Sequence, residues 1–171
     1  MSKLTQALWL LATVILAACS GYEVSFNDNV LYTPKELLKD VEVADRNLEL
    51  CIVQTIKDEK ITNVAQLTRL RCTHAGIVSL AGLERFYALT ELDLSDNEIT
   101  DIEVLERLGK LTMLLLDGNN IREAAPLLRL LKLTELTLGE NEQLACEELN
   151  KVETQIKQNN GTIEYPLHCQ H

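Results

Sequence analysis

The sequence predicts an α/β solenoid: a short curved parallel sheet of about four stacked repeats, with a helical cap at each end. One pattern of apolar residues recurs every 22 residues across residues 67–144, and its copies begin at Leu67, Leu89, Leu111 and Leu133. Within each copy the apolar residues first alternate and then fall at every third position. Because one copy cannot bury its own leucines, the copies are expected to stack and share one core.

The two halves of a copy predict two different backbone conformations. In the second copy Leu92 and Leu94 flank a polar residue, as a short strand with one buried face requires. Ile99, Ile102 and Leu105 then follow at a spacing of three, which suits a 3₁₀ or extended segment better than a regular α-helix. Each copy should therefore form one strand and return along the convex side.

Written out, the copies read L-x-x-L-x-L-x-x-N-x-I, and the chain therefore resembles the leucine-rich-repeat family. The 22-residue class resembles the repeats of internalins and of a regulatory subunit of a eukaryotic phosphatase. In this family the Asn side chain satisfies backbone groups at the bend after the strand. The resemblance gives that role to Asn97, Asn119 and Asn141, whereas Ala75 occupies the position in the first copy. The Asn ladder is thus expected to begin in the second copy.

The strand residues between the leucines are expected to point outward, onto the concave face. Copy by copy they are Arg69, Arg71 and Thr73; Glu91, Asp93 and Ser95; Met113, Leu115 and Asp117; and Glu135, Thr137 and Gly139. Met113 and Leu115 are unusual, because nothing in such a fold buries them, and they predict a contact patch with carboxylates around it. The alternative is that single exposed apolar residues are normal on any protein surface.

Residues 1–18 have the layout of a secretory signal peptide. Lys3 precedes an apolar run that is too short for a comfortable transmembrane helix. The run ends Leu16-Ala17-Ala18-Cys19, which matches the lipobox of bacterial lipoproteins. In that family the cysteine is acylated and becomes the first residue, so Cys19 is expected to hold the protein on a membrane through several acyl chains. An ordinary cleavage site beside a structural cysteine is the alternative.

Charge and the residue after Cys19 indicate how and where the protein is attached. After removal of residues 1–18, 15 basic residues stand against 26 acidic ones, a net charge of −11. This balance argues against nucleic acid as a partner and against an electrostatic grip on anionic lipid. Ser20, rather than Asp, follows Cys19, which in Gram-negative lipoproteins favours the outer membrane. The protein should face the periplasm or the cell surface.

The other four cysteines are expected to be paired in an exported protein, and three pairings are possible. Cys72 takes a leucine position of the first strand, and Cys51 lies on the apolar face of a helix that Asp45 would cap. That helix would cover the open end of the first copy. Cys146 and Cys169 flank a second amphipathic segment at the other end. The favoured pairs are Cys51–Cys72 and Cys146–Cys169, and both caps resemble those of small leucine-rich-repeat lipoproteins of Gram-negative bacteria.

These interpretations divide the chain into five parts. They are a signal peptide (1–18), the lipidated cysteine and a tether (19–29), the N-terminal helical cap (30–66), four repeats (67–144) and the C-terminal cap (145–171). A further helical turn is expected within residues 35–43.

No residues form a catalytic pattern, so the protein is predicted to be neither an enzyme nor a carrier of a cofactor or metal. None of the three histidines (His74, His168 and His171) has the spacing that would pair it with a nucleophile and an orienting acid. A soft metal at His168 and Cys169 would need a thiolate that the predicted disulfide removes. Aspartates of the concave face could hold calcium weakly, but a solvated acidic face is the favoured interpretation.

The predicted function is a lipid-anchored, monomeric protein-interaction module of the cell envelope. Its concave face would bind a protein or peptide, and its acidic rim favours a basic one. Two alternatives stand beside it: a structural envelope lipoprotein without a concave-face ligand, and a surface-exposed adhesin or host-contact factor.

Overall fold

The computed structural model describes residues 24–26, 29–32 and 35–170, in two compact units, Met1–Glu36 and Leu37–His171. In the first unit, strand β1 (Val24–Phe26) pairs antiparallel with strand β2 (Asn29–Tyr32). Strand β1 and the start of β2 thus lie within the segment predicted as a tether (19–29), where β-branched and aromatic residues favour a strand. The predicted signal peptide and the predicted lipidation of Cys19 lie outside the described residues.

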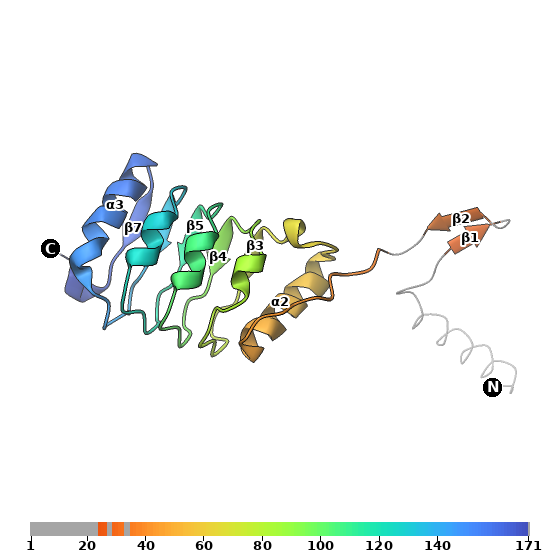
Figure 1. Cartoon of the computed structure of the whole chain (residues 1–171), viewed down its shortest axis with the longest axis horizontal. Helices are drawn as coiled ribbons and strands as arrows, with labels where there is room; N and C mark the ends of the chain where they lie inside the picture. The colour runs from red at the N-terminus through yellow and green to blue at the C-terminus, as the bar shows by residue number, and fades with distance from the viewer. Residues whose placement is uncertain (1–23, 27–28, 33–34, 171) are drawn as a thin grey trace, which may run out of the picture. The chain divides into compact units, whose positions relative to one another are not determined.

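The second unit is a leucine-rich-repeat solenoid, as predicted (Figure 1). Its sheet has five parallel strands in the order β3 (Arg69–Arg71), β4 (Glu91–Asp93), β5 (Met113–Leu115), β6 (Glu135–Thr137) and β7 (Thr162–Glu164). The 22-residue step sets the register from β3 to β6, so equivalent leucines lie side by side across the sheet, for example Leu92 beside Leu114.

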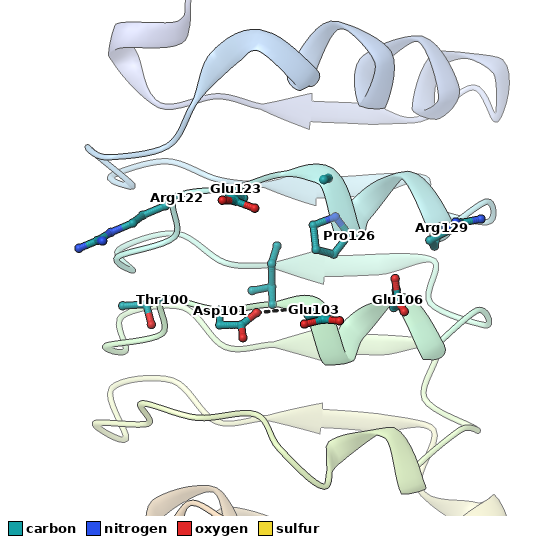
Figure 2. A pocket seen from close by; sticks show the side chains of 10 residues that line it. Thr100, Asp101, Glu103, Glu106, Arg122, Glu123, Pro126 and Arg129 are labelled. Atoms are coloured by element: carbon teal, nitrogen blue, oxygen red, sulfur yellow. Dashed lines mark hydrogen bonds between the residues drawn. The ribbon is translucent and has the colours of Figure 1, made fainter.

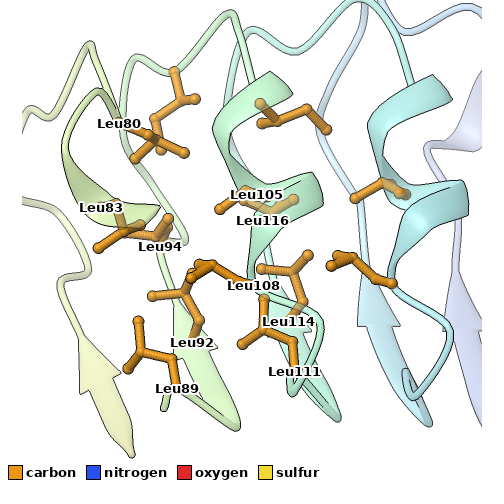
Figure 3. Close-up of a cluster of buried hydrophobic side chains, with 14 of the residues drawn as sticks. Leu80, Leu83, Leu89, Leu92, Leu94, Leu105, Leu108, Leu111, Leu114 and Leu116 are labelled. Atoms are coloured by element: carbon orange, nitrogen blue, oxygen red, sulfur yellow. The ribbon is translucent and has the colours of Figure 1, made fainter. Parts of the chain in front are cut away.

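The side opposite the sheet consists of short 3₁₀ helices, in agreement with the spacing of three in the sequence (Figure 1). They are η2 (Leu83–Arg85), η3 (Glu103–Arg107) and η4 (Ala125–Arg129). Leucines of the strands and of these segments interdigitate in one continuous core (Figure 3). Burial of each such side chain stabilises the fold by about 1.5–3 kcal/mol, so neighbouring copies hold one another in place.

The N-terminal cap is helix α2 (Arg46–Glu59), followed by the 3₁₀ helix η1 (Val64–Gln66). Asp45 caps the helix, as its sequence position predicts, and its carboxylate accepts two N–H groups of the first turn at 2.8 and 3.1 Å. The buried face of α2 covers the open end of the first copy.

The helical turn predicted within residues 35–43 is wrong, because this segment is irregular and extended. The N–H of Leu38 donates to the carbonyl of Ile61, and the N–H of Ala44 to the carbonyl of Ala81, both at 2.9 Å. Since tertiary partners take up these backbone groups and its apolar side chains pack on the core, the segment lies along the cap without forming a helix.

The C-terminal cap comprises the 3₁₀ helix η5 (Cys146–Glu148), helix α3 (Leu149–Gln158), strand β7 and the 3₁₀ helix η6 (Leu167–Cys169). Strand β7 pairs in parallel with β6. The extension of the sheet by this strand is a feature that the sequence does not predict.

One disulfide holds each cap, and the bonded cysteines are those of the two predicted pairs. Cys51 is bonded to Cys72, with 5.9 Å between their Cα atoms, and Cys146 to Cys169, with 5.5 Å. The first bond ties α2 to the end of β3, and the second closes the C-terminal cap. Among the described residues, no helix has the length and apolar character needed to cross a membrane.

Candidate interaction surface

The register of the sheet arranges the outward-pointing side chains in two rows across the strands. We call this exposed face of β3–β7 the concave face. One row is Arg69, Glu91, Met113, Glu135 and Thr162, and the other is Arg71, Asp93, Leu115, Thr137 and Glu164. The concave-face residues singled out from the sequence thus lie on one surface, in the order in which their strands pair.

The concave face contains a hollow of about 330 Å³ over strands β3, β4 and β5, within the size range of small ligand pockets. Met113 and Leu115 line it, and both side chains are partly exposed. Four more of the predicted binding residues line it with them: Arg69, Arg71, Glu91 and Asp93. The others, Asp117, Glu135 and Thr137, lie on the same face outside the hollow.

Helix α2 forms part of the wall of this hollow, through Thr55 and Glu59. From the sequence α2 is expected only to cap the core, because its apolar face is the only clear signal in the helix. No periodic pattern marks these two residues, and only the packing of α2 beside β3 brings them to the hollow. The N-terminal cap therefore both closes the core and shapes the concave face.

Two aspartates of the concave face are engaged within the protein. Asp93 Oδ2 lies 3.2 Å from Arg71 Nε, and Asp93 Oδ1 accepts the hydroxyl of Ser95 at 2.9 Å. Asp117 accepts the N–H of Gly139 at 2.7 Å and also the hydroxyl of Thr137. Both carboxylates therefore have hydrogen-bond or ion-pair partners within the protein.

Three other charged residues of the concave face, Arg69, Glu91 and Glu135, form no ion pair within residues 35–170. Arg69 and Glu91 are exposed and Glu135 is half-buried. Their charges are thus available to a partner.

The scaffold under this surface rests on the Asn side chains after the strands. Asn97 donates to the carbonyls of Cys72 and Leu94, both at 2.8 Å, and its Oδ1 accepts the N–H groups of Ala75 and Ile77. It therefore satisfies the bend of its own copy and that of the first copy, which lacks an Asn. Asn119 and Asn141 make equivalent bonds one and two copies later.

A second ladder, of threonines, lies at the start of the strands and is not among the features predicted from the sequence. The hydroxyls of Thr90, Thr112 and Thr134 each donate to the carbonyl of the threonine 22 residues earlier, at 3.0–3.1 Å. The signal was present, since a threonine follows the first leucine of all four copies. Both ends of each strand are thus fixed by side chains, which keeps the concave rows in register.

Within residues 35–170, one group of potential metal ligands comes together: Cys146, His168 and Cys169. Both sulfurs belong to the disulfide, and His168 Nε2 lies 2.9 Å from the carbonyl oxygen of Leu144. The group therefore offers no thiolate. His74, in the bend after β3, is exposed and lies 3.3 Å from Asp96 Oδ2.

A second hollow, of about 720 Å³, lies on the convex side between η3 and η4 (Figure 2). Ala125, which lines it, takes the place that Glu103 has one copy earlier. Its walls are mainly charged: Asp101, Glu103 and Glu106 on one side, and Arg122, Glu123 and Arg129 on the other. Because apolar anchors supply most of the binding energy at interfaces, the concave hollow is the better candidate.

Comparison with known proteins agrees with this architecture. The leucine rich repeat family matches residues 65–121. An internalin of Listeria monocytogenes, InlF, is 31% identical over 57% of this chain and 31% of its own, with a TM-score of 0.53. Internalin C2 of the same bacterium is 23% identical over 60% of this chain and 48% of its own, with a TM-score of 0.54.

The functional domain of InlJ, also from Listeria monocytogenes, is 24% identical over 60% of this chain and 26% of its own, with a TM-score of 0.51. The chain thus spans less than half of each of these internalins. No curated protein matches it. The chain folds as a leucine-rich-repeat solenoid similar to those of bacterial internalins.

Proposed function

We propose that this protein is an interaction module that binds a segment of another protein in the hollow of its concave face. The observation that carries the proposal is the pair Met113 and Leu115, two apolar side chains left partly exposed in a hollow that no element within residues 37–170 fills. Exposed apolar side chains in a concave site are typical anchors for a partner, and solenoids commonly bind through this face.

We also propose that Cys19 carries a lipid anchor, which would place the module on the outer membrane, facing the periplasm or the outside. The lipobox sequence Leu16-Ala17-Ala18-Cys19 supports the anchor. The two disulfides fit an oxidising compartment such as the periplasm.

The anchor can be tested by metabolic labelling with a radioactive fatty acid. The wild-type protein should incorporate label and sediment with membranes, whereas Cys19→Ser should do neither. Label in the Cys19→Ser protein, or its continued sedimentation with washed membranes, would contradict the anchor. Protease treatment of intact cells then separates a surface-exposed protein from a periplasmic one.

The binding proposal can be tested by capture from envelope extracts. The bait is residues 19–171 with Cys19→Ser, beside the same bait with Met113→Glu and Leu115→Glu. A matched control carries Leu131→Glu and Leu167→Glu, which alter two leucines away from the concave hollow that are 67% and 86% exposed. Circular dichroism checks that all three baits are folded.

A protein retained by the wild-type and control baits but lost from the concave variant would support the proposal. Equal retention by all three baits would mean that the concave hollow is not the binding site. A protein with no specific concave-face ligand would instead have a structural role in the envelope.

A further inference from the structure

We infer that the segment bound in the concave hollow is dipolar, with an acidic group, an apolar side chain and a basic group in that order. The acidic group lies at Arg69, the apolar side chain at Met113 and Leu115, and the basic group over Glu135 and Glu164. This inference rests on the proposed function. It replaces the expectation of a simply basic partner, which rests on the acidic rim of the concave face.

On the concave face both basic residues lie on β3, whereas the charged residues of β4, β6 and β7 are all acidic. On β3 the outward side chains are Arg69 and Arg71, and these are the basic residues of the two rows. On β6 and β7 the outward charges are Glu135 and Glu164, both acidic. A uniformly basic segment would meet the arginines of β3 at one end, so charge complementarity favours a segment with opposite charges at its two ends.

Arg69 and Arg71 differ in how far their charges are neutralised. Arg71 Nε lies 3.2 Å from Asp93 Oδ2. Arg69 also lines the hollow, with Glu59 and Glu91 among its other lining residues, yet it forms no ion pair within residues 35–170. Arg69 is thus the guanidinium that remains available, and its planar group suits bidentate binding of a carboxylate.

The spacing of the strands sets the spacing of the groups in the partner. Adjacent strands lie about 4.8 Å apart, so two steps, from β3 to β5 or from β5 to β7, cover roughly 10 Å. A chain in the polyproline II conformation rises about 3.1 Å per residue with three residues per turn, so side chains three residues apart lie on one face and match one two-strand step. The fitting segment therefore carries its acidic, apolar and basic residues at intervals of about three.

Synthetic peptides with this spacing provide the probe. The dipolar peptide is acetyl-Glu-Gly-Gly-Leu-Gly-Gly-Lys-amide, and the two comparison peptides have Lys at both ends or Glu at both ends. The glycines leave side-chain direction free. Binding is measured by titrating the ¹⁵N-labelled chain, residues 19–171 with Cys19→Ser, and following the amide shifts of β3–β7.

The dipolar peptide is expected to shift concave-face amides and to bind at least threefold more tightly than either comparison peptide. Arg69→Gln should weaken dipolar binding about tenfold, in line with the loss of a charge-assisted hydrogen bond. Arg71→Gln, which removes an arginine already paired with Asp93, should have a smaller effect. Because Arg69 is exposed, its replacement should leave the melting temperature unchanged.

Tighter binding of the doubly basic peptide would overturn the dipolar assignment, as would a dipolar peptide that leaves the concave amides unshifted. The capture experiment separates this failure from a failure of the proposed function. Suppose that a protein is lost from the Met113→Glu/Leu115→Glu bait but fully retained by an Arg69→Gln bait. This result would support binding in the concave hollow and contradict the role assigned to Arg69.

Discussion

The two ends of the solenoid are closed in different ways. At the N-terminal end helix α2 covers the core and adds no strand to the sheet. At the C-terminal end helix α3 covers the core and the chain then returns through β7 as a fifth parallel strand. The C-terminal cap thus behaves as a modified repeat, whereas the N-terminal cap interrupts the pattern and reaches the concave face through Thr55 and Glu59.

This difference separates stability from binding. Both caps bury an apolar helix face and both hold one disulfide, so the loss of either should destabilise the solenoid to a similar degree. Only the N-terminal cap lines the concave hollow, whereas the C-terminal cap reaches the concave face outside the hollow, through β7. Matched changes in the two caps should therefore lower the free energy of unfolding by similar amounts. The change in the N-terminal cap should weaken binding more than the change in the C-terminal cap.

The largest effects should come from matched truncations in the two cap helices, Ile56→Ala and Ile156→Ala. Both side chains are buried, at 2% and 0% exposure, and each change should lower the free energy of unfolding by about 2–5 kcal/mol. Because contacts in a solenoid are mostly between neighbours, Ile56→Ala should reduce hydrogen-exchange protection first in β3, and Ile156→Ala first in β6 and β7. Uniform loss of protection in both variants would mean that the caps are not independent.

Removal of one disulfide at a time should have the next largest effect. The two bonds join residues 21 and 23 positions apart, and each should contribute about 3 kcal/mol by the loop-entropy estimate. Chemical denaturation of Cys51→Ala/Cys72→Ala and of Cys146→Ala/Cys169→Ala measures both contributions. The first variant should also weaken binding of the dipolar peptide, since α2 forms a wall of the hollow. An equal loss of binding in the second variant would contradict the assigned asymmetry.

A smaller effect is expected from Gly161→Ala, which tests how β7 joins the sheet. A Cβ atom at this position would lie 2.2 Å from the carbonyl oxygen of Thr134, the residue before β6. The backbone must shift to remove this overlap, which should lower the free energy of unfolding by about 1–3 kcal/mol. Gly109→Ala is the matched control, because a Cβ there would meet nothing within 4 Å. If the melting temperature falls equally in both variants, the close approach of β7 to Thr134 is not the reason that position 161 requires glycine.

The smallest effect concerns pH and again distinguishes the caps. Asp45 caps α2, and its Oδ2 also accepts the N–H groups of Val78 and Ser79, at 2.9 and 3.2 Å. Burial raises the pKa of Asp45, but the four backbone N–H donors together lower it below its ordinary value. Helix α3, in contrast, has no side-chain cap.

Because the folded pKa of Asp45 lies below its unfolded value of about 3.9, the stabilisation is complete above that pH. It is lost as the pH falls through the folded pKa. Asp45→Asn should therefore lose stability at pH 7 and show a shallower decline than wild type below about pH 4. Denaturation curves at several pH values check this, and parallel declines for the two proteins would exclude the role of the carboxylate.

The repeating part of the fold could be predicted because its signals are local. The leucines of β4 and β5 and the triplet spacing of the convex segments report burial directly in the sequence. Strand β7 could not be predicted as part of the sheet, since Thr162–Glu164 lies out of step with the 22-residue period and lacks the leucines. Its conformation comes from pairing with β6, a tertiary contact.

The candidate site was predicted in part for the same reason. Alternation within the strands identified Met113, Leu115 and their charged neighbours. Thr55 and Glu59 could not be found, because their role depends on where α2 packs rather than on a pattern in its sequence. The threonine ladder, in contrast, could have been predicted from the sequence, because the Leu-Thr pair recurs in all four copies.

The most direct test of the central claim is photocrosslinking in intact cells, with a benzoylphenylalanine residue placed at Met113 or, as a control, at exposed Leu131. If the concave hollow binds a partner protein, irradiation should produce a discrete adduct from position 113 and none of the same mass from position 131. No adduct at 113, or the same adduct from both positions, would contradict the claim.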